Sequence, residues 1–201
     1  MLKERFDIIE KPEWVSAEEI CNLIHRAHVV NFEKHLLYGS ATITTDDIDK
    51  LLSVAKCFVV VDAMGKKLIG VGFVKPFQKK GTFFSGKACD FCRTAIDLDY
   101  QGKGLYSCLL KQGLNSLPKD VEYCTLSTAE ENNAVCRSVE KFGFRRINYS
   151  AHSNNNFYSV DYIWCRNLSF LKRLVIKFQY LFSRIRTIAL YKPGGIKRFC
   201  F

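Results

Sequence analysis

Apolar residues along the chain alternate between the spacing of helices and that of strands. A helix is predicted from Ser16, which can form a capping box with Glu19, to about His28. Thr45 is predicted to cap a second helix, whose first turn is acidic. Apolar and β-branched runs predict strands at 3–9, 57–63, 68–74 and 88–98. A turn at 64–67 joins the second of these strands to the third, and a polar loop at 78–87 precedes the fourth.

A glycine turn follows the last of these strands. The strand ends at Leu98. The turn that follows contains Gly102 and Gly104, and apolar residues then recur at helical spacing from Leu105. Glycine lets a ligand approach the backbone closely, and a helix start presents unpaired N–H groups and the positive end of a dipole. The turn is therefore predicted to bind an anion such as a pyrophosphate. Neither the dinucleotide fingerprint nor the P-loop pattern fits it.

Two motifs resemble those of one enzyme family. Residues 101–106, Q-G-K-G-L-Y, resemble the Q/R-x-x-G-x-G/A acetyl-CoA signature of the GNAT (Gcn5-related) N-acetyltransferases, with Tyr106 where that signature has Gly or Ala. Residues 132–144 resemble the second signature, an Asn and a helix that ends in Lys-x-Gly-Phe, in the family's order and spacing.

The resemblance covers about residues 2–166. Further elements are predicted as helices at 104–116 and 132–142 and strands at 121–128, 144–151 and 157–164. The order β-αα-βββ-α-β-α-ββ matches the GNAT fold, an α/β (α+β) architecture with a mixed central sheet flanked by helices. We therefore expect an acetyltransferase domain at 1–166 and a basic amphipathic extension at 167–201.

The resemblance implies a binding site for acetyl-CoA. In the family the strand before the turn splays from its neighbour, and the cofactor arm lies in the gap against backbone amides, here those of Thr94 and Ile96. Asn132 matches an asparagine that contacts the arm; it can also cap its helix. Gln101 closes the turn, and the amides that cradle the pyrophosphate are those of Gly102, Lys103, Gly104, Leu105 and Tyr106.

A carboxylate is expected to serve as the catalytic base, because an amine attacks only as its free base and an alkylammonium has a pKa near 10. Asp90 lies eleven residues before Gln101, which matches the catalytic glutamate of histone-acetylating family members. Asp97 is the second candidate. The alternative for either residue is a pair with Arg93 or a solvated strand end.

The residue at the position of the family's usual general acid differs from the family pattern. Many members have a tyrosine where this chain has Val139. Either the thiolate leaves unprotonated, or Ser138, Cys136 or a tyrosine from elsewhere protonates it.

The predicted function is transfer of an acetyl group from acetyl-CoA to a primary amine of a small molecule or peptide, by direct attack on the thioester. The segment between the first two helices borders the acceptor site in the family, so His35 and Tyr38 are candidates for substrate contact or for structural roles. The competing class is a non-catalytic acyl-CoA-binding or membrane-associated interaction protein.

The composition indicates the cellular compartment and bears on metal binding. Nine cysteines, mostly inside strand-like or helix-like runs, predict reduced thiols in a cytoplasmic protein. Cys89 and Cys92 form the only C-x-x-C pair and the four histidines lack ligand spacing, so no metal is predicted. The N-terminus has no apolar segment typical of a signal peptide.

Positive charge is concentrated in the tail. Of the net charge of +10, nine units follow Asp161, beyond which there is no acidic residue, so residues 1–161 carry +1. Residues 168–190 predict an amphipathic basic helix that is too often interrupted by charge to span a bilayer. Its apolar stripe could pack on the core or on a second subunit of a homodimer, lie peripherally on the inner membrane surface, or bind nucleic acid. We favour packing against protein narrowly over the membrane, and both over nucleic acid.

Overall fold

The computed structural model describes residues 6–33, 40, 42–62, 67–79, 84–152 and 157–191. The strands are β1 (Phe6–Glu10), β2 (Lys56–Asp62), β3 (Leu68–Lys79), β4 (Gly86–Ile96), β5 (Tyr123–Ala129), β6 (Arg145–His152) and β7 (Phe157–Cys165). The helices are α1 (Ala17–Glu33), α2 (Thr45–Leu52), α3 (Leu105–Asn115), α4 (Asn133–Lys141) and α5 (Phe170–Leu190), with a 3-10 turn, η1, at Leu98–Tyr100.

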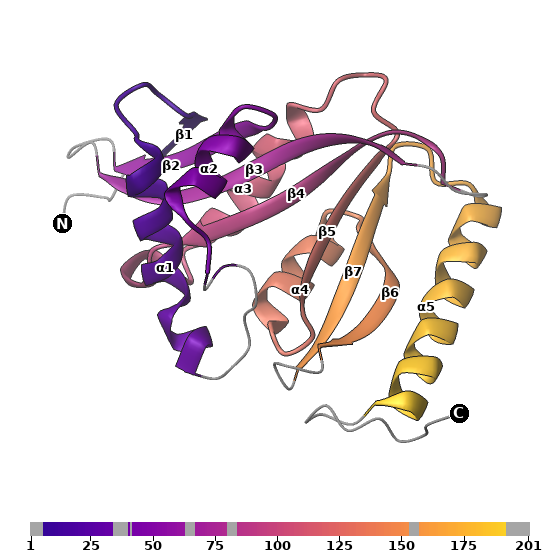
Figure 1. Ribbon diagram of the computed structural model, residues 1–201. Helices are drawn as coiled ribbons and strands as arrows, with labels where there is room; N and C mark the ends of the chain where they lie inside the picture. The colour runs from indigo at the N-terminus through magenta and orange to yellow at the C-terminus, as the bar shows by residue number, and fades with distance from the viewer. Residues whose placement is uncertain are drawn as a thin grey trace.

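The strands form one mixed sheet in the order β1-β2-β3-β4-β5-β7-β6 (Figure 1). Among the described strands, β4 and β5 alone pair in parallel, and the other neighbours pair antiparallel. Helices α1 and α2 cover one face of the sheet, and α3 covers the other. The predicted mixed sheet flanked by helices is confirmed.

Strand β2 shows how the sequence builds these two layers. Phe58 and Val60 pack in the cluster that contains α3, whereas Val59 and Val61 pack with α1 and α2. Because both faces of the strand are covered, its sequence is a continuous apolar run rather than an alternating one.

A bulge and a parting of strands shape the middle of the sheet. Val71 pairs with Ala95 and Phe73 with Cys92, so two β4 residues, Arg93 and Thr94, lie opposite Gly72 alone. Arg93 takes up the strain with a φ of +51°, in the left-handed region. The register of β4 with β5 covers only Ala88–Asp90 and Tyr123–Thr125, and beyond these pairs the two strands separate.

Two element ends near the N-terminus differ from the expectation. Helix α1 continues to Glu33, five residues past His28. Helix α2 is capped by Thr44 rather than Thr45, because Thr44 Oγ1 accepts from the backbone N–H of Asp47 and the Asp47 carboxylate accepts from that of Thr44. The predicted box of Ser16 and Glu19 is confirmed by both of its hydrogen bonds.

The predicted loop at 78–87 is shorter than expected. Gln78 pairs with Lys87 and Lys79 with Gly86, so β3 and β4 run on into the expected loop. The register of β2 with β3 ends at Val74, so Pro76 lies where β3 has a neighbour on one side only, and a missing N–H is tolerated there.

Helix α5 lies along β6, the edge strand of the sheet (Figure 1). Ile176 is its buried apolar residue, in a small cluster with Ile147 and Ile163. The expectation that the apolar stripe of this helix packs on the core is wrong for the single chain: most of the stripe faces outward, and Phe178 and Phe182 are 68% and 70% exposed. Within the described residues, no helix is apolar enough over a sufficient length to cross a membrane.

Candidate functional site

A cleft of about 1200 Å³ opens where β4 and β5 part. Its walls are residues 91–96 of β4 and 126–129 of β5, and the glycine turn and the start of α3 lie at one end. Residues of α1, α2 and α4 complete the lining. The parting predicted from the resemblance is thus present as a real cleft, at the predicted strand.

The glycine turn adopts a backbone that other residues rarely adopt. Gly102 and Gly104 both have a φ of +78°, and a Cβ added at either would meet no atom within 4 Å. Gly104 is also the N-cap residue of α3, where it provides no side-chain hydrogen bond. Helices α2, α4 and α5, in contrast, begin with a side chain that accepts from their first turn. The start of α3 therefore keeps its N–H groups for another acceptor.

The end of β4 is held by one backbone hydrogen bond to β3 and by two side chains, those of Gln101 and His28. The Asp97 N–H donates to Ile69 O on β3 at 2.8 Å, so the alternation of a strand turns the Ile96 N–H toward the cleft edge. Gln101 Nε2 donates to Ile96 O at 2.9 Å, which gives Gln101 the predicted role of closing the turn. His28 on α1 similarly hydrogen-bonds the backbone of Thr94.

His28 lines the cleft, and the sequence analysis gave it no role at the site. Burial lowers its pKa below the ordinary value, the hydrogen bond to Thr94 partly opposes this, and the nearby positive charge of Arg93 adds to the lowering. The ring is therefore neutral near pH 7 and positions β4 without adding charge. No motif marks this residue; only the packing of α1 beside β4 brings it here.

Asp90 lies at the apex of the cleft, in the last pair before the strands separate. Burial raises the pKa of its carboxyl, and the negative charge of Asp161 adds to the rise. Thr125 Oγ1 donates to Asp90 Oδ1 at 2.8 Å, and this bond opposes the rise, as do the charges of Lys75 and Arg93. A carboxylate with a raised pKa is a better base than a solvated one.

Asp97 has a different environment. Its Oδ1 accepts from the Asp99 N–H and caps η1, and its Oδ2 lies 3.4 Å from Arg26 Nη2. The residue is buried and lies outside the lining of the cleft. The pair is with Arg26 rather than with the Arg93 considered from the sequence. These contacts favour Asp90 over Asp97 as the base.

Most of the predicted cofactor-binding residues come together around the cleft. The lining includes Thr94, Ile96, Gln101, Gly102, Gly104, Leu105, Tyr106 and Asn132. The side chain of Lys103 instead turns to the rings of Tyr100 and Phe6. Tyr106 packs its ring edge-on against Phe91, so its bulk fills the floor of the cleft rather than the turn. Asn132 caps α4, since its side chain accepts from the Val135 N–H.

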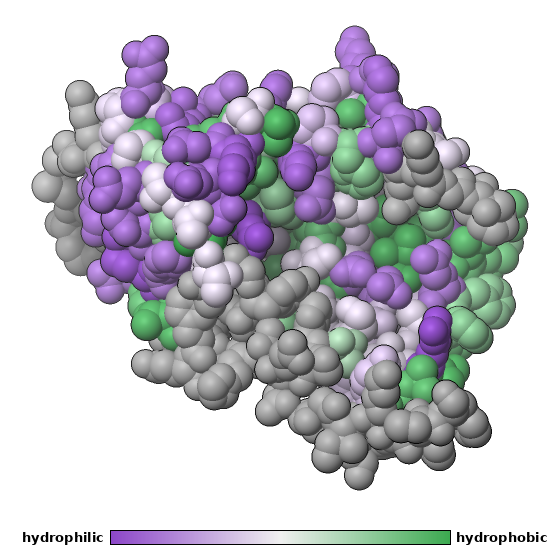
Figure 2. Space-filling view, in the orientation of Figure 1, coloured by the Kyte–Doolittle hydropathy of each residue, from purple (hydrophilic) through white to green (hydrophobic). Residues whose placement is uncertain are grey.

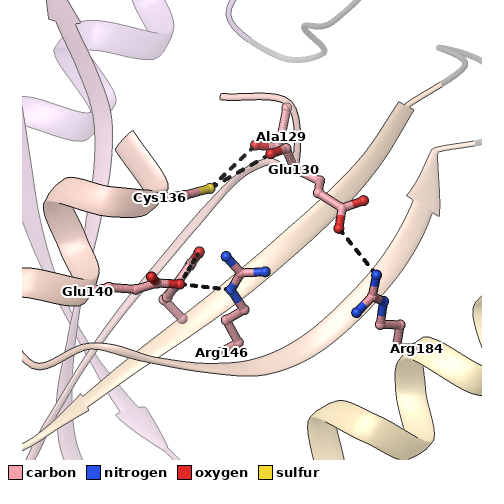
Figure 3. Close-up of polar contacts among 7 residues, drawn as sticks. Ala129, Glu130, Cys136, Glu140, Arg146 and Arg184 are labelled. Atoms are coloured by element: carbon pink, nitrogen blue, oxygen red, sulfur yellow. Dashed lines mark hydrogen bonds and ion pairs between the residues drawn. The ribbon is translucent and has the colours of Figure 1, made fainter. Parts of the chain in front are cut away.

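The position of the usual tyrosine holds no phenol. Val139 is fully buried in the core. Ser138 lines the cleft and shares a 2.6 Å hydrogen bond with Ser107 of α3. Cys136 points instead at the carbonyl oxygens of Ala129 and Glu130 and ties α4 to the end of β5 (Figure 3).

The part of the lining that α2 contributes carries both charges. Asp47 and Lys50 of α2 line the cleft, together with Ser40, Thr42 and Ile43 from the segment between α1 and α2. His35 and Tyr38, the candidates for substrate contact in that segment, lie outside the described residues.

The described part of the chain gives no indication of a metal-binding site. There, no three His, Cys, Asp or Glu side chains are grouped to hold a metal ion. The eight cysteines within the described ranges are free thiols, six of them buried.

Comparison with known proteins finds similarity in structure rather than in sequence. The sequence matches no protein-family model and no curated protein. Solved structures that it resembles include Arabidopsis thaliana NAA60 in complex with a bisubstrate analogue, at 14% identity and a TM-score of 0.61 over 81% of this chain and 100% of that one.

Two bacterial acetyltransferase structures are similar to this chain as well. A Streptococcus pneumoniae acetyltransferase of the GNAT family is 15% identical, with a TM-score of 0.58 over 80% of this chain and 99% of that one. The Vibrio cholerae spermidine N-acetyltransferase in complex with CoA and spermine is 17% identical, with a TM-score of 0.57 over 80% and 95% of the two chains. The described chain, with its seven-stranded sheet parting at β4 and β5, therefore has the fold of the GNAT N-acetyltransferases.

Proposed function

We propose that this chain is an N-acetyltransferase with acetyl-CoA as the donor and a primary amine as the acceptor. The observation that carries the proposal is the cleft itself, which has a helix start without a side-chain cap at one end and a half-buried carboxylate with a raised pKa at its apex. The similar Vibrio cholerae structure contains CoA and an amine, which agrees with a donor and an acceptor of these classes.

The residues around the turn fit the donor. The left-handed backbone of Gly102 and Gly104 leaves open space above the turn, and the uncapped start of α3 supplies N–H groups and a positive dipole end for the pyrophosphate. The Ile96 N–H on the cleft edge would hold the cofactor arm, and Asn132 lies on the opposite wall. Acetyl-CoA supplies the acetyl group as an activated thioester.

Asp90 would act as the general base. It accepts one proton from the acceptor ammonium, and the free amine nitrogen bonds to the thioester carbonyl carbon. The carbon–sulfur bond then breaks with its electron pair on sulfur, and the nitrogen loses a second proton, which leaves an amide and, once the sulfur is protonated, the free thiol of CoA. Ser138 and Tyr106 line the same cleft, and their hydroxyls are candidate donors for the sulfur. Burial raises the pKa of Tyr106, so its phenol stays protonated and can donate a hydrogen bond to sulfur.

The experiment is a thiol-release assay with acetyl-CoA and a panel of amines, including polyamines, small primary amines and peptides with free N-termini. We expect release that depends on an acceptor and falls in Asp90→Asn. Acetyl-CoA hydrolysis at a rate that does not depend on any acceptor would contradict the proposal.

The alternative is a non-catalytic acyl-CoA-binding module, which Val139 in the position of the usual tyrosine favours. The two functions are separated by combining the assay with calorimetry. Tight binding of acetyl-CoA without turnover on any amine identifies a module, whereas acceptor-dependent release identifies an enzyme.

A further inference from the structure

The inner face of helix α5 mixes apolar and polar residues. It includes Ile176, Tyr180, Ser183 and Thr187, which follow one another at spacings of four, three and four. Most of the large apolar residues lie on the opposite face. This arrangement reverses the usual one, in which an amphipathic helix turns its apolar side to the core.

The edge of the sheet explains why this orientation is held. Because β6 is the outermost strand, the N–H and C=O of Tyr149 point out of the sheet. Ser183 Oγ accepts from the Tyr149 N–H at 3.0 Å, and Thr187 Oγ1 donates to Tyr149 O at 2.9 Å. Rotating the helix to bury its apolar side would leave both backbone groups without these partners.

The outward face is broad and apolar. Its seven large side chains are each between 41% and 76% exposed; they are Phe170, Leu171, Phe178, Leu181, Phe182, Ile185 and Ile188. Figure 2 shows a hydrophobic band along the edge of the molecule where α5 lies in Figure 1. A continuous apolar band along a helix about 30 Å long exceeds the scattered apolar residues of an ordinary surface and marks an interaction site.

Basic residues border this face on both sides. Arg173 and Lys177 share one flank and Arg186 lies on the other, whereas Arg184 of the first flank turns to Glu130 of the core (Figure 3). All of these side chains are exposed, and no acidic residue follows Asp161 in the sequence. An apolar band with basic borders is the pattern of a helix that lies in the plane of a membrane interface.

We propose that the outer face of α5 binds the surface of an anionic membrane, with its phenylalanines and aliphatic residues among the acyl chains and its basic flanks against lipid phosphates. A second copy of this chain fits less well, because a symmetric contact through α5 would bring the basic flanks of two copies together. The surface is separate from the cleft and does not depend on acetyl transfer.

Vesicle flotation of the full chain tests the proposal. We expect the wild type to float with phosphatidylcholine vesicles that contain phosphatidylglycerol, to float weakly with phosphatidylcholine alone, and to be released by high salt. Replacing both Phe178 and Phe182 with serine should reduce partitioning at least about tenfold. The control, Trp14→Ser with Val29→Ser, removes two exposed apolar residues elsewhere and should leave it unchanged.

Charge is tested separately by Arg173→Gln, Lys177→Gln and Arg186→Gln in one chain. Each basic residue near an anionic surface contributes about a fivefold factor, so partitioning should fall by about 10². The matched control replaces three exposed lysines away from α5 with glutamine: Lys111, Lys119 and Lys141.

Two outcomes would overturn the proposal. One is equal flotation of the wild type and the serine variant. The other is a wild-type dimer in sedimentation that becomes a monomer in the serine variant and does not float with either vesicle; that result would assign the face to a second copy. Melting temperatures of all variants confirm that they fold.

Discussion

Two regions of the molecule place residues against their ordinary preference. The apex of the cleft holds the half-buried carboxylate of Asp90, whose pKa is raised by partial burial, and the outer face of α5 exposes large apolar side chains such as Phe178. Both arrangements cost folding free energy, but they are supported differently. Asp90 has a hydrogen-bond partner in Thr125 and lies eleven residues before a recognisable motif. The face of α5, in contrast, is held outward because the opposite face bonds to the sheet edge. A site such as the cleft can be recognised from a local sequence motif. A surface such as the outer face of α5 cannot, because its orientation depends on the packing of the rest of the fold.

The contrast between the two faces of α5 should give the largest effect on stability. Ile176→Ala removes a fully buried side chain and should lower the free energy of unfolding by about 2–5 kcal/mol. Phe178→Ala, on the outer face, should change it by less than about 0.5 kcal/mol. Urea unfolding of both variants measures the difference. Equal losses would mean that the outer face is covered in the isolated protein.

Truncation after Arg166 extends the same test. It removes the partners of Tyr149 on the strand edge as well as Ile176, so the melting temperature should fall. A truncated chain as stable as the full one would show that the β6 edge does not need α5.

At the apex of the cleft, Asp90→Asn should lower turnover by about 10² or more at neutral pH, with a smaller loss at high pH, where the amine is already free. The matched control is Asp97→Asn on the same segment of chain, which should alter stability through Arg26 and η1 more than it alters turnover. The measurement is the pH–rate profile of both variants. An unchanged profile for Asp90→Asn would remove this residue from the mechanism.

The glycine turn allows a control within the same chain. Ala at Gly102 or Gly104 must adopt a φ of +78°, and Ala at Gly143, which ends α4 away from the cleft, must adopt +86°. Each substitution should cost about 1–2 kcal/mol of stability. Only the two turn variants should also lose affinity for acetyl-CoA, by roughly tenfold, as calorimetry can measure. Loss of affinity in Gly143→Ala, or its retention in Gly102→Ala with Gly104→Ala, would place the cofactor elsewhere.

The sequence was sufficient for the parts of this fold that depend on local signals. The spacing of the two motifs predicted the glycine turn, and both glycines adopt the left-handed backbone that the prediction needs. The capping box of Ser16 and Glu19 likewise depends on four consecutive residues and was predicted correctly.

The features that were missed depend on residues far apart in the chain. The bulge at Arg93 exists only in register with β3, and His28 reaches the cleft only because α1 packs beside β4. The periodicity of α5 revealed an apolar stripe, but the direction in which it faces follows from β6 being an edge strand. Helical spacing alone carries no information about which face of a helix a sheet edge will require.

The smallest effect concerns the stability of the cleft as a function of pH. Because the pKa of Asp90 is raised in the folded state, the folded chain holds this proton more tightly than the unfolded chain. Above the folded pKa, the ionised, half-buried carboxylate therefore destabilises the fold. Asp90→Asn removes that charge and can still accept from Thr125. The variant should therefore be more stable than the wild type at pH 7, and the difference should disappear as the pH falls through the folded pKa toward about 4, where the wild-type carboxyl is protonated too. Urea unfolding at both pH values checks this. If the variant were instead less stable than the wild type at pH 7, with a smaller loss near pH 4, the ionised carboxylate would be stabilising its surroundings. The apex of the cleft would then resemble an ordinary structural charge pair rather than a site that gives up stability for catalysis.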